Sequence, residues 1–420
     1  MKHATSHIPL NDQATAVVVS LASGKRSCGS PRTGVIPRAA GLLAILAVVS
    51  IFVLPARGLA ESIRVVYGFD REFAPFTYEE PGGKPIGFEI ELMDAIFHGT
   101  EATLVHRPLQ WDRVPLELSA GTITITSSMV RTEQRSKLFL FSELPSFPLQ
   151  IRLFTKVYNR FPSAKLLRGQ MVSVEKGTYQ NRLLEAFGGM NIKTFPNRVD
   201  GLRALYNDEV VAYCAPMQNT YYYINKLNYG AITTVGTPLG ITEMRIAINR
   251  DRGDVKRLVD EGLARLVASG EYDRLYRKWF VRELTDQERD TMLKAARTAA
   301  IPAYAPYDEK GQGAAILTAT GKVYSACTVE NADLSLILSA LRGAVARAVS
   351  EGEYELRAAV VVDQQGNLQP LAPEELQVLY EFGRGVLSLT EPEKGRYETS
   401  MIAQLLMNPI IRETATVKVE

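Results

Sequence analysis

From residue 62 onwards, short apolar segments alternate with amphipathic ones, the pattern of an α/β protein. Residues 63–67 (Ile-Arg-Val-Val-Tyr) predict a first strand, and residues 171–174 predict another. Residues 87–97 interleave acidic and apolar side chains, which is typical of a surface helix, and residues 180–187 also predict a helix. Residues 255–280 show a long helical periodicity.

A second helical unit begins where the sequence Thr285-Asp-Gln-Glu288 predicts a capping box, so we expect a domain boundary near Leu284. The chain has 420 residues, more than one domain usually contains, which favours two or three globular units. With 46% hydrophobic and 22% charged residues, the composition is that of folded rather than disordered protein.

The first sixty residues have the character of a targeting segment. Residues 39–55 form an uninterrupted apolar run preceded by three arginines, and the small residues Gly58 and Ala60 suit a signal-peptidase cut before Glu61. We therefore expect export, with residues 1–60 as a signal peptide. The run nearly reaches membrane-spanning length, so an uncleaved anchor is the alternative, and the long stretch before it is explained if translation starts further downstream.

The charge of the chain changes sign once this segment is set aside. The whole sequence has a formal net charge of +2, but the residues after 60 contain 42 Lys and Arg against 45 Asp and Glu. A balanced, slightly acidic protein offers no electrostatic surface for nucleic acid, so we expect no nucleic-acid partner.

Cysteine usage does not suggest a disulfide framework. Cys28 lies in the targeting segment, which leaves Cys214 and Cys327. A bridge between these two would have to join different domains, so two buried free thiols are the favoured interpretation.

Six short motifs follow one another in the first half of the chain. They are Phe69-Asp-Arg-Glu-Phe-Ala-Pro-Phe76, Pro85-Ile-Gly-Phe-Glu-Ile-Glu-Leu92, Met129-Val-Arg-Thr-Glu-Gln-Arg135, Phe141-Ser142, Lys176-Gly-Thr178, and Gly270-Glu-Tyr272 with Lys278-Trp-Phe280. Over residues 62–284 their order resembles the amino-acid-binding receptors of solute-binding protein family 3. The resemblance implies a two-lobed periplasmic-binding-protein type II fold over 61–284, in which the lobes close on a ligand between them. Lobe 1 would comprise residues 62–151 and 248–284, and lobe 2 residues 155–245.

The resemblance also implies a set of ligand-binding residues. Arg135 occupies the position that holds an α-carboxylate, a task suited to a planar guanidinium that donates two parallel hydrogen bonds. Thr178, at a predicted helix start, would add a hydroxyl and backbone N–H groups. Phe73 and Trp111 would form aromatic walls, and Asp70 would help to receive an ammonium. The alternatives are a solvated helix-cap role for Arg135 and core positions for the two aromatic residues.

The sequence also departs from the family pattern around this site. Residues 210–218 contain no carboxylate where the family usually places one for the ligand's ammonium, and Val130 replaces a threonine. Ser128, which we also expect in the site, stands where glycine is common. A buried ammonium without a counter-charge is unfavourable. Either Asp70, Glu243 or another group compensates, or the ligand lacks an α-amino group.

A different series of motifs occupies residues 286–412. It comprises Ala303-Tyr-Ala-Pro-Tyr307, Gly313-Ala-Ala-Ile-Leu317, Gly321-Lys-Val-Tyr324, Val329-Glu-Asn-Ala332, Ala348-Val-Ser-Glu-Gly352, Ala358-Ala-Val-Val-Val362 and Gln377-Val-Leu-Tyr-Glu-Phe382. In order and spacing these resemble cytidine deaminases. The resemblance implies a C-terminal three-layer α/β/α domain over residues 285–412, followed by a tail at 413–420.

The residues for zinc chemistry are missing from this second unit. Deamination needs a metal-bound water and a glutamate that transfers protons. The family's Cys-Ala-Glu-Arg helix start reads Ser339-Ala-Leu341-Arg here, and its Pro-Cys-x-x-Cys turn is replaced by Pro373-Glu-Glu375. We therefore expect no metal, no cofactor and no deaminase activity. Glu330 matches a ribose-contacting position, which leaves residual nucleoside binding open, with a structural or partner-docking role favoured.

Three functions are consistent with this organisation. The favoured one is an exported binding protein for a small carboxylate-bearing solute, serving a membrane transporter (of the ABC type) or a sensor, with a pseudoenzyme domain attached. The second is a dehydratase-like enzyme on the same fold, with Asp70, Glu175 or Glu243 as acid and base. The third is a docking or inhibitor-like protein.

Overall fold

The structure is a computed structural model that describes residues 63–159, 161–308 and 310–406. The predicted targeting segment 1–60 and the tail 413–420 lie outside these residues. The described residues all belong to one compact unit. Within the described ranges, no helix is both long enough and apolar enough to span a bilayer.

Lobe 1 is built around three parallel strands. β1 (Ile63–Asp70) lies between β5 (Ala102–Leu109) and β6 (Ile125–Val130). α2 (Phe88–Phe97) packs its apolar face against α8 (Gly253–Ala268). The remaining elements are α3 (Val114–Ser119), α4 (Glu133–Leu138), β7 (Phe139–Phe141) and a small sheet of β2 (Glu72–Phe73), β3 (Thr77–Glu79) and β4 (Pro85–Ile86). The predicted first strand and the predicted helix at 87–97 are confirmed.

The long helical periodicity over 255–280 corresponds to two helices. α8 ends at Ala268 and α9 (Glu271–Phe280) begins after Gly270, whose φ of 74° lies in the left-handed region that glycine adopts readily. Hydrophobic periodicity continues across one such residue, so it does not reveal the break. The turn directs Tyr272 and Tyr276 of α9 into the core beside Phe88.

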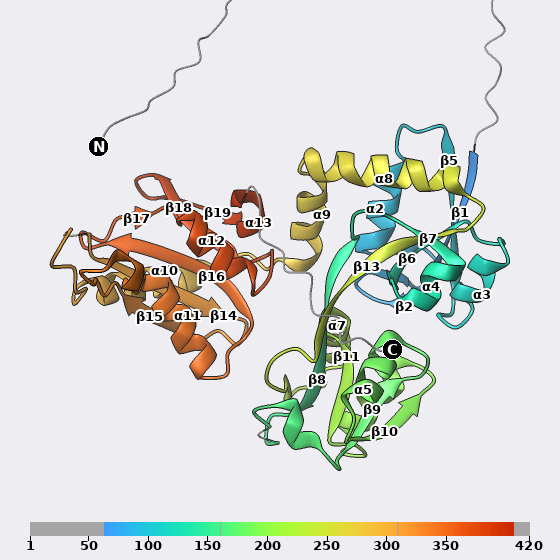
Figure 1. Cartoon of the computed structure of the whole chain (residues 1–420), viewed down its shortest axis with the longest axis horizontal. Coiled ribbons are helices and arrows are strands. Elements are labelled where there is room, and N and C mark those ends of the chain that lie inside the picture. The colour runs from blue at the N-terminus through green and yellow to red at the C-terminus, as the bar shows by residue number, and fades with distance from the viewer. Residues whose placement is uncertain (1–62, 160, 309, 407–420) are drawn as a thin grey trace, which may run out of the picture. The chain divides into compact units, whose positions relative to one another are not determined.

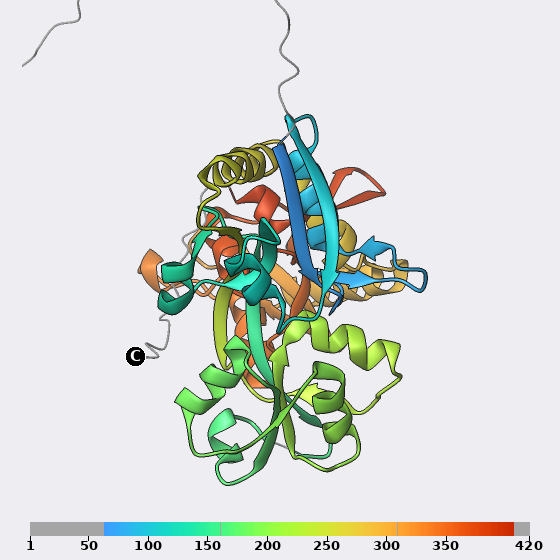
Figure 2. The ribbon, with the colours of Figure 1, turned by 90° about the vertical axis from the view of Figure 1, so that its right-hand side faces the viewer.

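Lobe 2 has the same layered arrangement. β9 (Met171–Glu175) lies between β10 (Asn191–Phe195) and β11 (Ala212–Pro216), all parallel. α5 (Tyr179–Phe187) and α6 (Arg198–Tyr206) pack against these strands, and Figure 2 shows the green helices of this lobe beside its sheet. The lobe also contains α7 (Met217–Lys226), β12 (Ile232–Thr234) and a 3-10 turn at Ala164–Leu167. The strand predicted at 171–174 and the helix predicted at 180–187 are confirmed.

Two long antiparallel strands connect the lobes. β8 (Phe147–Lys156) and β13 (Gly240–Asn249) pair with each other over Phe147–Ile151, and both run from one lobe into the other (Figure 1). β13 continues beside β6 of lobe 1, whereas β8 continues beside β11 of lobe 2. The strands of both lobes therefore belong to one sheet. The two connections between the lobes that the sequence places at residues 151–155 and 245–248 lie within β8 and β13.

The C-terminal unit is a sheet with helices on both faces. β14 (Gln312–Thr318) lies between β15 (Val323–Cys327) and β16 (Leu356–Asp363). The alternation along β14 sends Ala315 and Leu317 to the side of α10 (Asp286–Ala300), and Ala314 and Ile316 to the side of α11 (Ala340–Ser350). The other elements are β17 (Leu368–Gln369), β18 (Leu387–Glu393), β19 (Arg396–Met401), α12 (Pro373–Tyr380), α13 (Ile402–Leu405) and a 3-10 turn at Leu334–Leu336. This is the three-layer arrangement that the sequence predicts.

The start of α10 confirms the predicted capping box. The Thr285 hydroxyl accepts from the Glu288 amide at 3.2 Å, and the Glu288 carboxylate accepts from the Thr285 amide at 3.0 Å. The helix then lies so close to β14 that a Cβ on Gly313 would fall 2.1 Å from the Ala296 carbonyl oxygen. Glycine at 313 is therefore required by the distance between helix and strand.

The C-terminal unit contacts both lobes. Arg384 forms a 2.5 Å ion pair with Asp273 of α9, on the lobe 1 side. The Tyr221 hydroxyl on α7 of lobe 2 donates to Glu355 at 2.9 Å. Each of these bonds connects residues more than a hundred positions apart, so neither is visible in the local sequence pattern.

Cys214 and Cys327 are both free thiols, so the interdomain bridge is wrong. Cys214 is buried as expected, and burial raises the pKa of its thiol. Cys327 is only half-buried, contrary to the expectation, because β15 is the edge strand of its sheet.

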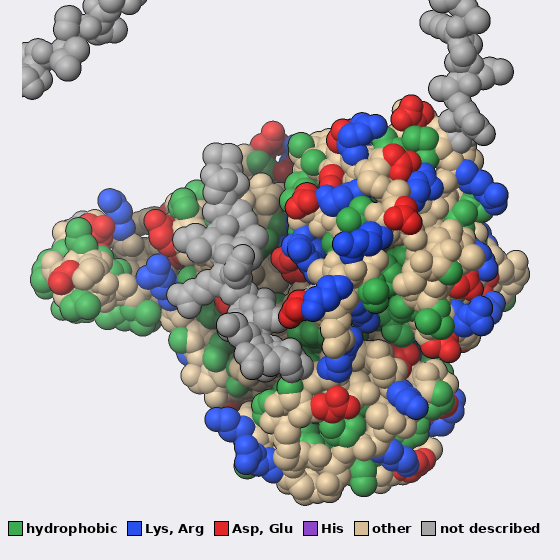
Figure 3. All heavy atoms as spheres, turned by 45° about the vertical axis from the view of Figure 1, so that its right-hand side comes forward, with side chains coloured by type: hydrophobic (Ala, Val, Ile, Leu, Met, Phe, Trp, Pro, Cys, Tyr) green, Lys and Arg blue, Asp and Glu red, His purple; other side chains and the backbone are tan. Residues whose placement is uncertain are grey.

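Figure 3 shows Lys and Arg intermingled with Asp and Glu on the visible face rather than gathered into a patch of one sign.

Candidate functional site

A small cavity of about 40 Å³ lies between the lobes. Its walls come from the ends of β1, β6 and β9, from α4, from the start of α5 and from α6. All six residues expected from the sequence line it: Asp70, Phe73, Trp111, Ser128, Arg135 and Thr178. The other lining residues are Val130, Leu149, Glu175, Tyr179, Gln180, Arg198, Pro216 and Met244. The fold thus brings the expected residues from both lobes to one place.

Arg135 presents a guanidinium that has no acidic partner within the described part of the chain. It belongs to the short helix α4, whose N-cap Thr132 accepts from the Arg135 amide at 3.2 Å. Its Nη1 donates to the Val130 carbonyl at 2.9 Å, and the guanidinium carbon lies 5.7 Å from the centroid of the Trp111 ring. No described carboxylate lies within ion-pair distance of it. Burial, together with the charge of Arg182, lowers the pKa of Arg135 to about 10, so it remains charged at neutral pH.

The opposite side of the cavity is an ion triad that joins the lobes. Arg198 Nη2 lies 2.6 Å from Asp70 Oδ2, across the cleft, and 3.3 Å from Glu175 Oε1 within lobe 2. Burial by itself would lower the pKa of Arg198, but the charges of Asp70 and Glu175 raise it above its ordinary value. Burial raises the pKa of Glu175, Arg198 opposes that shift, and Asp70 adds to it.

The two aromatic residues are both core and cavity residues. Phe73 packs in the main hydrophobic core, and its ring centroid lies 4.7 Å from the Arg198 guanidinium carbon. Trp111 packs against a smaller cluster that contains Leu118. The alternatives of core packing and cavity lining therefore do not exclude each other.

Ser128 and Thr178 use their hydroxyls within the protein. Ser128 has a φ of 57°, in the left-handed region, and its hydroxyl donates to the buried Glu89. The Thr178 hydroxyl donates to the Glu175 carbonyl at 2.7 Å and caps α5 by accepting from Asn181. The Thr178 hydroxyl proton is therefore already in use. An anion near residue 178 can instead be bound by the backbone N–H groups at the start of α5.

Sequence reasoning missed Arg198 altogether and considered Glu175 only as an enzymatic acid or base. Arg198 is the first residue of α6 and follows the N-cap Asn197, a position that resembles many solvated helix starts. Only the fold places it 2.6 Å from Asp70, a residue 128 positions away. Glu175 directly precedes the Lys176-Gly-Thr178 motif, which could have drawn attention to it.

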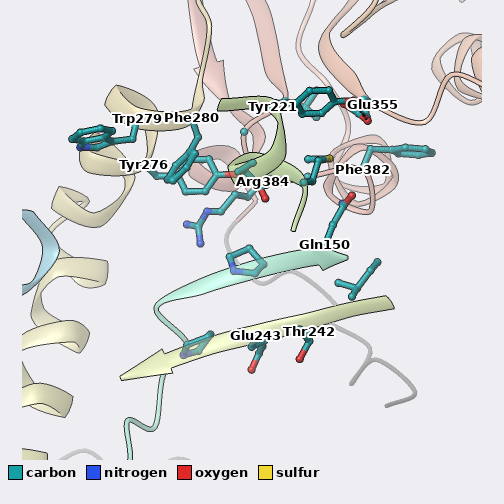
Figure 4. Close-up of a pocket in the computed structure, with 18 of the residues that line it drawn as sticks. Gln150, Tyr221, Thr242, Glu243, Tyr276, Trp279, Phe280, Glu355, Phe382 and Arg384 are labelled. Atoms are coloured by element: carbon teal, nitrogen blue, oxygen red, sulfur yellow. Dashed lines mark hydrogen bonds between the residues drawn. The ribbon is translucent and has the colours of Figure 1, made fainter. Parts of the chain in front are cut away.

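Glu243 lies in a different, larger cleft of about 1670 Å³. In Figure 4, Gln150 and Glu243 stand on the strands β8 and β13, below Trp279 of α9 and beside residues of the C-terminal unit. Glu243 pairs with Arg245 at 2.7 Å. Glu243 does not line the cavity between the lobes, so of the alternatives for a counter-charge there, Glu243 is ruled out.

In the C-terminal unit, Ser339 and Leu341 occupy the start of α11. The Ser339 hydroxyl caps the helix by accepting from the Arg342 amide at 3.2 Å, and it forms a hydrogen bond with Glu375 of α12. Leu341 is fully buried in the core between α11 and the sheet. Glu330 accepts from the Tyr307 amide at 2.8 Å.

Residues 65–282, over half of the chain, match the family of bacterial extracellular solute-binding proteins, family 3. The chain belongs to this family. Residues 286–394 match the cytidine deaminase-like family. The expectations of both families and of the α/β fold class are confirmed.

Individual relatives agree with this division. The L-cystine-binding protein TcyJ of Escherichia coli (strain K12) is 23% identical over 253 residues, which cover 58% of this chain and 94% of that protein. The cytidine deaminase of Sporosarcina psychrophila is 32% identical over 126 residues, covering 30% of this chain and 92% of that protein. A solved histidine kinase sensor domain with similarity to periplasmic binding proteins matches with a TM-score of 0.50 at 22% identity, covering 52% of this chain and 97% of that one, and shows the fold alone.

The residues of the cytidine deaminase-like domain do not fit a zinc ion. Zinc in such sites is bound by thiolates or imidazoles. Where the starts of α11 and α12 meet, this domain has the Ser339 hydroxyl hydrogen-bonded to the Glu375 carboxyl. No group of three or more His, Cys, Asp or Glu side chains suited to a metal ion occurs among the residues that the structure describes.

Proposed function

We propose that this solute-binding protein holds a small carboxylate-bearing solute, an amino acid or a related acid, in the cavity between its lobes. The observation that carries the proposal is the Arg135 guanidinium, which faces the cavity without an acidic partner. A buried unpaired cation is unfavourable unless an anion joins it, and a carboxylate matches the fork of the guanidinium. The relative named for L-cystine binding supports an amino-acid-like ligand class.

Closure of the lobes is the second part of the proposal. Asp70 of lobe 1 and Arg198 of lobe 2 form an ion pair across the cavity, and β8 and β13 connect the lobes behind it. A carboxylate bound to Arg135 of lobe 1 lies within reach of the backbone N–H groups at the start of α5 in lobe 2. Ligand binding then favours the closed state because both lobes contribute contacts.

We place the protein outside the cytoplasm, exported by its N-terminal segment, with a membrane transporter or sensor as the partner that receives the closed form. The family description as extracellular supports this placement. For the cytidine deaminase-like domain we propose a non-enzymatic docking role. Leu341 cannot transfer a proton, and the contacts of Arg384 and Glu355 tie the domain to both lobes.

A dehydratase-like activity is the second candidate. Glu175 lies in the cavity next to the proposed carboxylate site, and its raised pKa suits a general acid. Turnover of a cyclohexadienyl acid in solution, lost in Glu175→Gln, would support this candidate over simple binding.

The binding proposal is tested by thermal shift of the full chain against a panel of amino acids, oxo acids and nucleosides. We expect stabilisation by at least one carboxylate, and loss of that shift in Arg135→Ala. The matched control is Arg131→Ala, because Arg131 is an exposed arginine four residues away that bonds to Ser136 outside the cavity. Absence of any carboxylate-dependent shift, or an unchanged shift in Arg135→Ala, would refute the proposal.

A further inference from the structure

Arg198 occupies the acidic side of the cavity between the lobes. Asp70 and Glu175 are the two carboxylates that line this cavity, and the Arg198 guanidinium contacts both, at 2.6 Å and 3.3 Å. The same group donates to the Glu72 carbonyl at 3.3 Å and stacks 4.7 Å from the centre of the Phe73 ring. An ammonium beside Asp70 would need space that Arg198 already fills.

The backbone and the burial of Arg198 hold it in this position. The Asn197 side chain fixes the start of α6 by accepting from the Asp200 amide at 2.9 Å, so the residue that follows it is directed toward the cleft. The Arg198 side chain is 7% exposed, and its partner Asp70 is 4% exposed. Arg198 is thus a cation that the protein itself builds into the cavity between the lobes.

The charges that line the cavity leave one group unbalanced. Asp70 and Glu175 share the positive charge of Arg198, and burial raises the pKa of Glu175, which favours its neutral form, whereas Arg135 has no acidic partner among the described residues. An amino acid would satisfy Arg135 with its carboxylate, but its ammonium would have to displace Arg198 and leave that buried guanidinium unpaired. Removing one partner from a buried ion pair is strongly unfavourable. A carboxylate without an ammonium brings only the charge that the cavity lacks.

The cavity, as the structure has it, is also small. A volume of about 40 Å³ offers room for about three water molecules, which suits an acid of a few heavy atoms. Building on the proposed function, we propose that Arg198 stands in for the ligand's ammonium, so that the solute is a short 2-oxo or 2-hydroxy carboxylic acid rather than an amino acid. Arg198 is then a specificity-determining residue.

The test is calorimetric titration of the full chain with pyruvate, L-lactate and L-alanine, which share one carbon skeleton. We expect the wild type to prefer pyruvate or lactate over alanine by at least tenfold. Arg198→Met keeps an unbranched apolar stem against Phe73 and frees Asp70 and Glu175, so it should reverse the preference. Arg198→Lys keeps the cation and should retain it. Arg203→Met, on the exposed face of the same helix, is the matched control and should leave the preference unchanged.

The outcomes separate this inference from the proposed function. Equal or tighter binding of alanine by the wild type, abolished in Arg135→Ala, overturns the inference and leaves the carboxylate site intact. An unchanged preference in folded Arg198→Met also overturns it. If Arg198→Met does not fold, loss of the preference in Arg198→Lys does so instead. Failure of all three acids to bind, together with no carboxylate response in the thermal-shift panel, overturns the proposed function and the inference with it.

Discussion

The contact between Arg384 and Asp273 predicts that the cytidine deaminase-like domain is energetically coupled to lobe 1. The guanidinium forms a 2.5 Å ion pair with Asp273 and lies 4.7 Å and 5.3 Å from the centres of the Tyr272 and Tyr276 rings. The two charged side chains are 20% and 17% exposed, between the surface and the interior.

The magnitude follows from these exposures. Removing one partner of a fully buried ion pair destabilises a protein by about 3–5 kcal/mol, whereas exposed pairs contribute about 0–1 kcal/mol. A cation over an aromatic face adds about 0.5–2 kcal/mol. We therefore expect Arg384→Ala to lower the free energy of unfolding by about 2–4 kcal/mol.

The assay is a double-mutant cycle of Arg384→Ala and Asp273→Ala in urea-induced unfolding, which isolates the pairwise interaction. We expect an interaction energy of about 1–3 kcal/mol for the pair. Arg396→Ala is the control, since Arg396 is an exposed arginine of the same domain, paired with Glu398, and should change stability by less than about 0.5 kcal/mol. An interaction energy below about 0.5 kcal/mol between Arg384 and Asp273 would refute the coupling.

Three further predictions concern stability. Burial raises the pKa of Glu89, so the native state keeps a proton that the unfolded chain releases, and the contribution of Glu89 to wild-type stability falls as pH rises above about 4.3. Glu89→Gln lacks this titration, so the melting temperature of the variant minus that of the wild type should increase between pH 4 and 7. A difference that stays constant over this range would contradict the prediction. Leu341→Ala removes a fully buried core side chain and should destabilise by about 2–5 kcal/mol in urea unfolding, without changing solute binding. Gly313→Ala would place a Cβ 2.1 Å from the Ala296 carbonyl, so we expect a lower melting temperature by calorimetry, and an unchanged one would show that α10 can move away.

Local sequence features were sufficient to predict several helices and strands. Strand β1, helix α2 and the capping box of Thr285 and Glu288 follow from periodicity and from residues within one turn of each other. The exception is the break between α8 and α9, where one left-handed glycine redirects the chain without disturbing the apolar period. The order of motifs was also sufficient to recognise both families, because each motif is local.

The site was predictable only in part. Arg135 was predicted from a single motif, residues 129–135. The fold brings Arg135 together with the other expected residues in one cavity. The partner of Asp70 could not be predicted, because Arg198 reaches it from another lobe across 128 positions. Glu243, a candidate by charge alone, faces a different cleft.

The sequence by itself thus determined the two families and the order of the domains, since these depend on residue identity at fixed local spacing. Only the tertiary structure decided which charges meet. It paired Arg198 with Asp70 and gave Arg135 no acidic partner among the residues that the structure describes, because ion pairs across a cleft depend on how β8 and β13 bring the lobes together rather than on any local period.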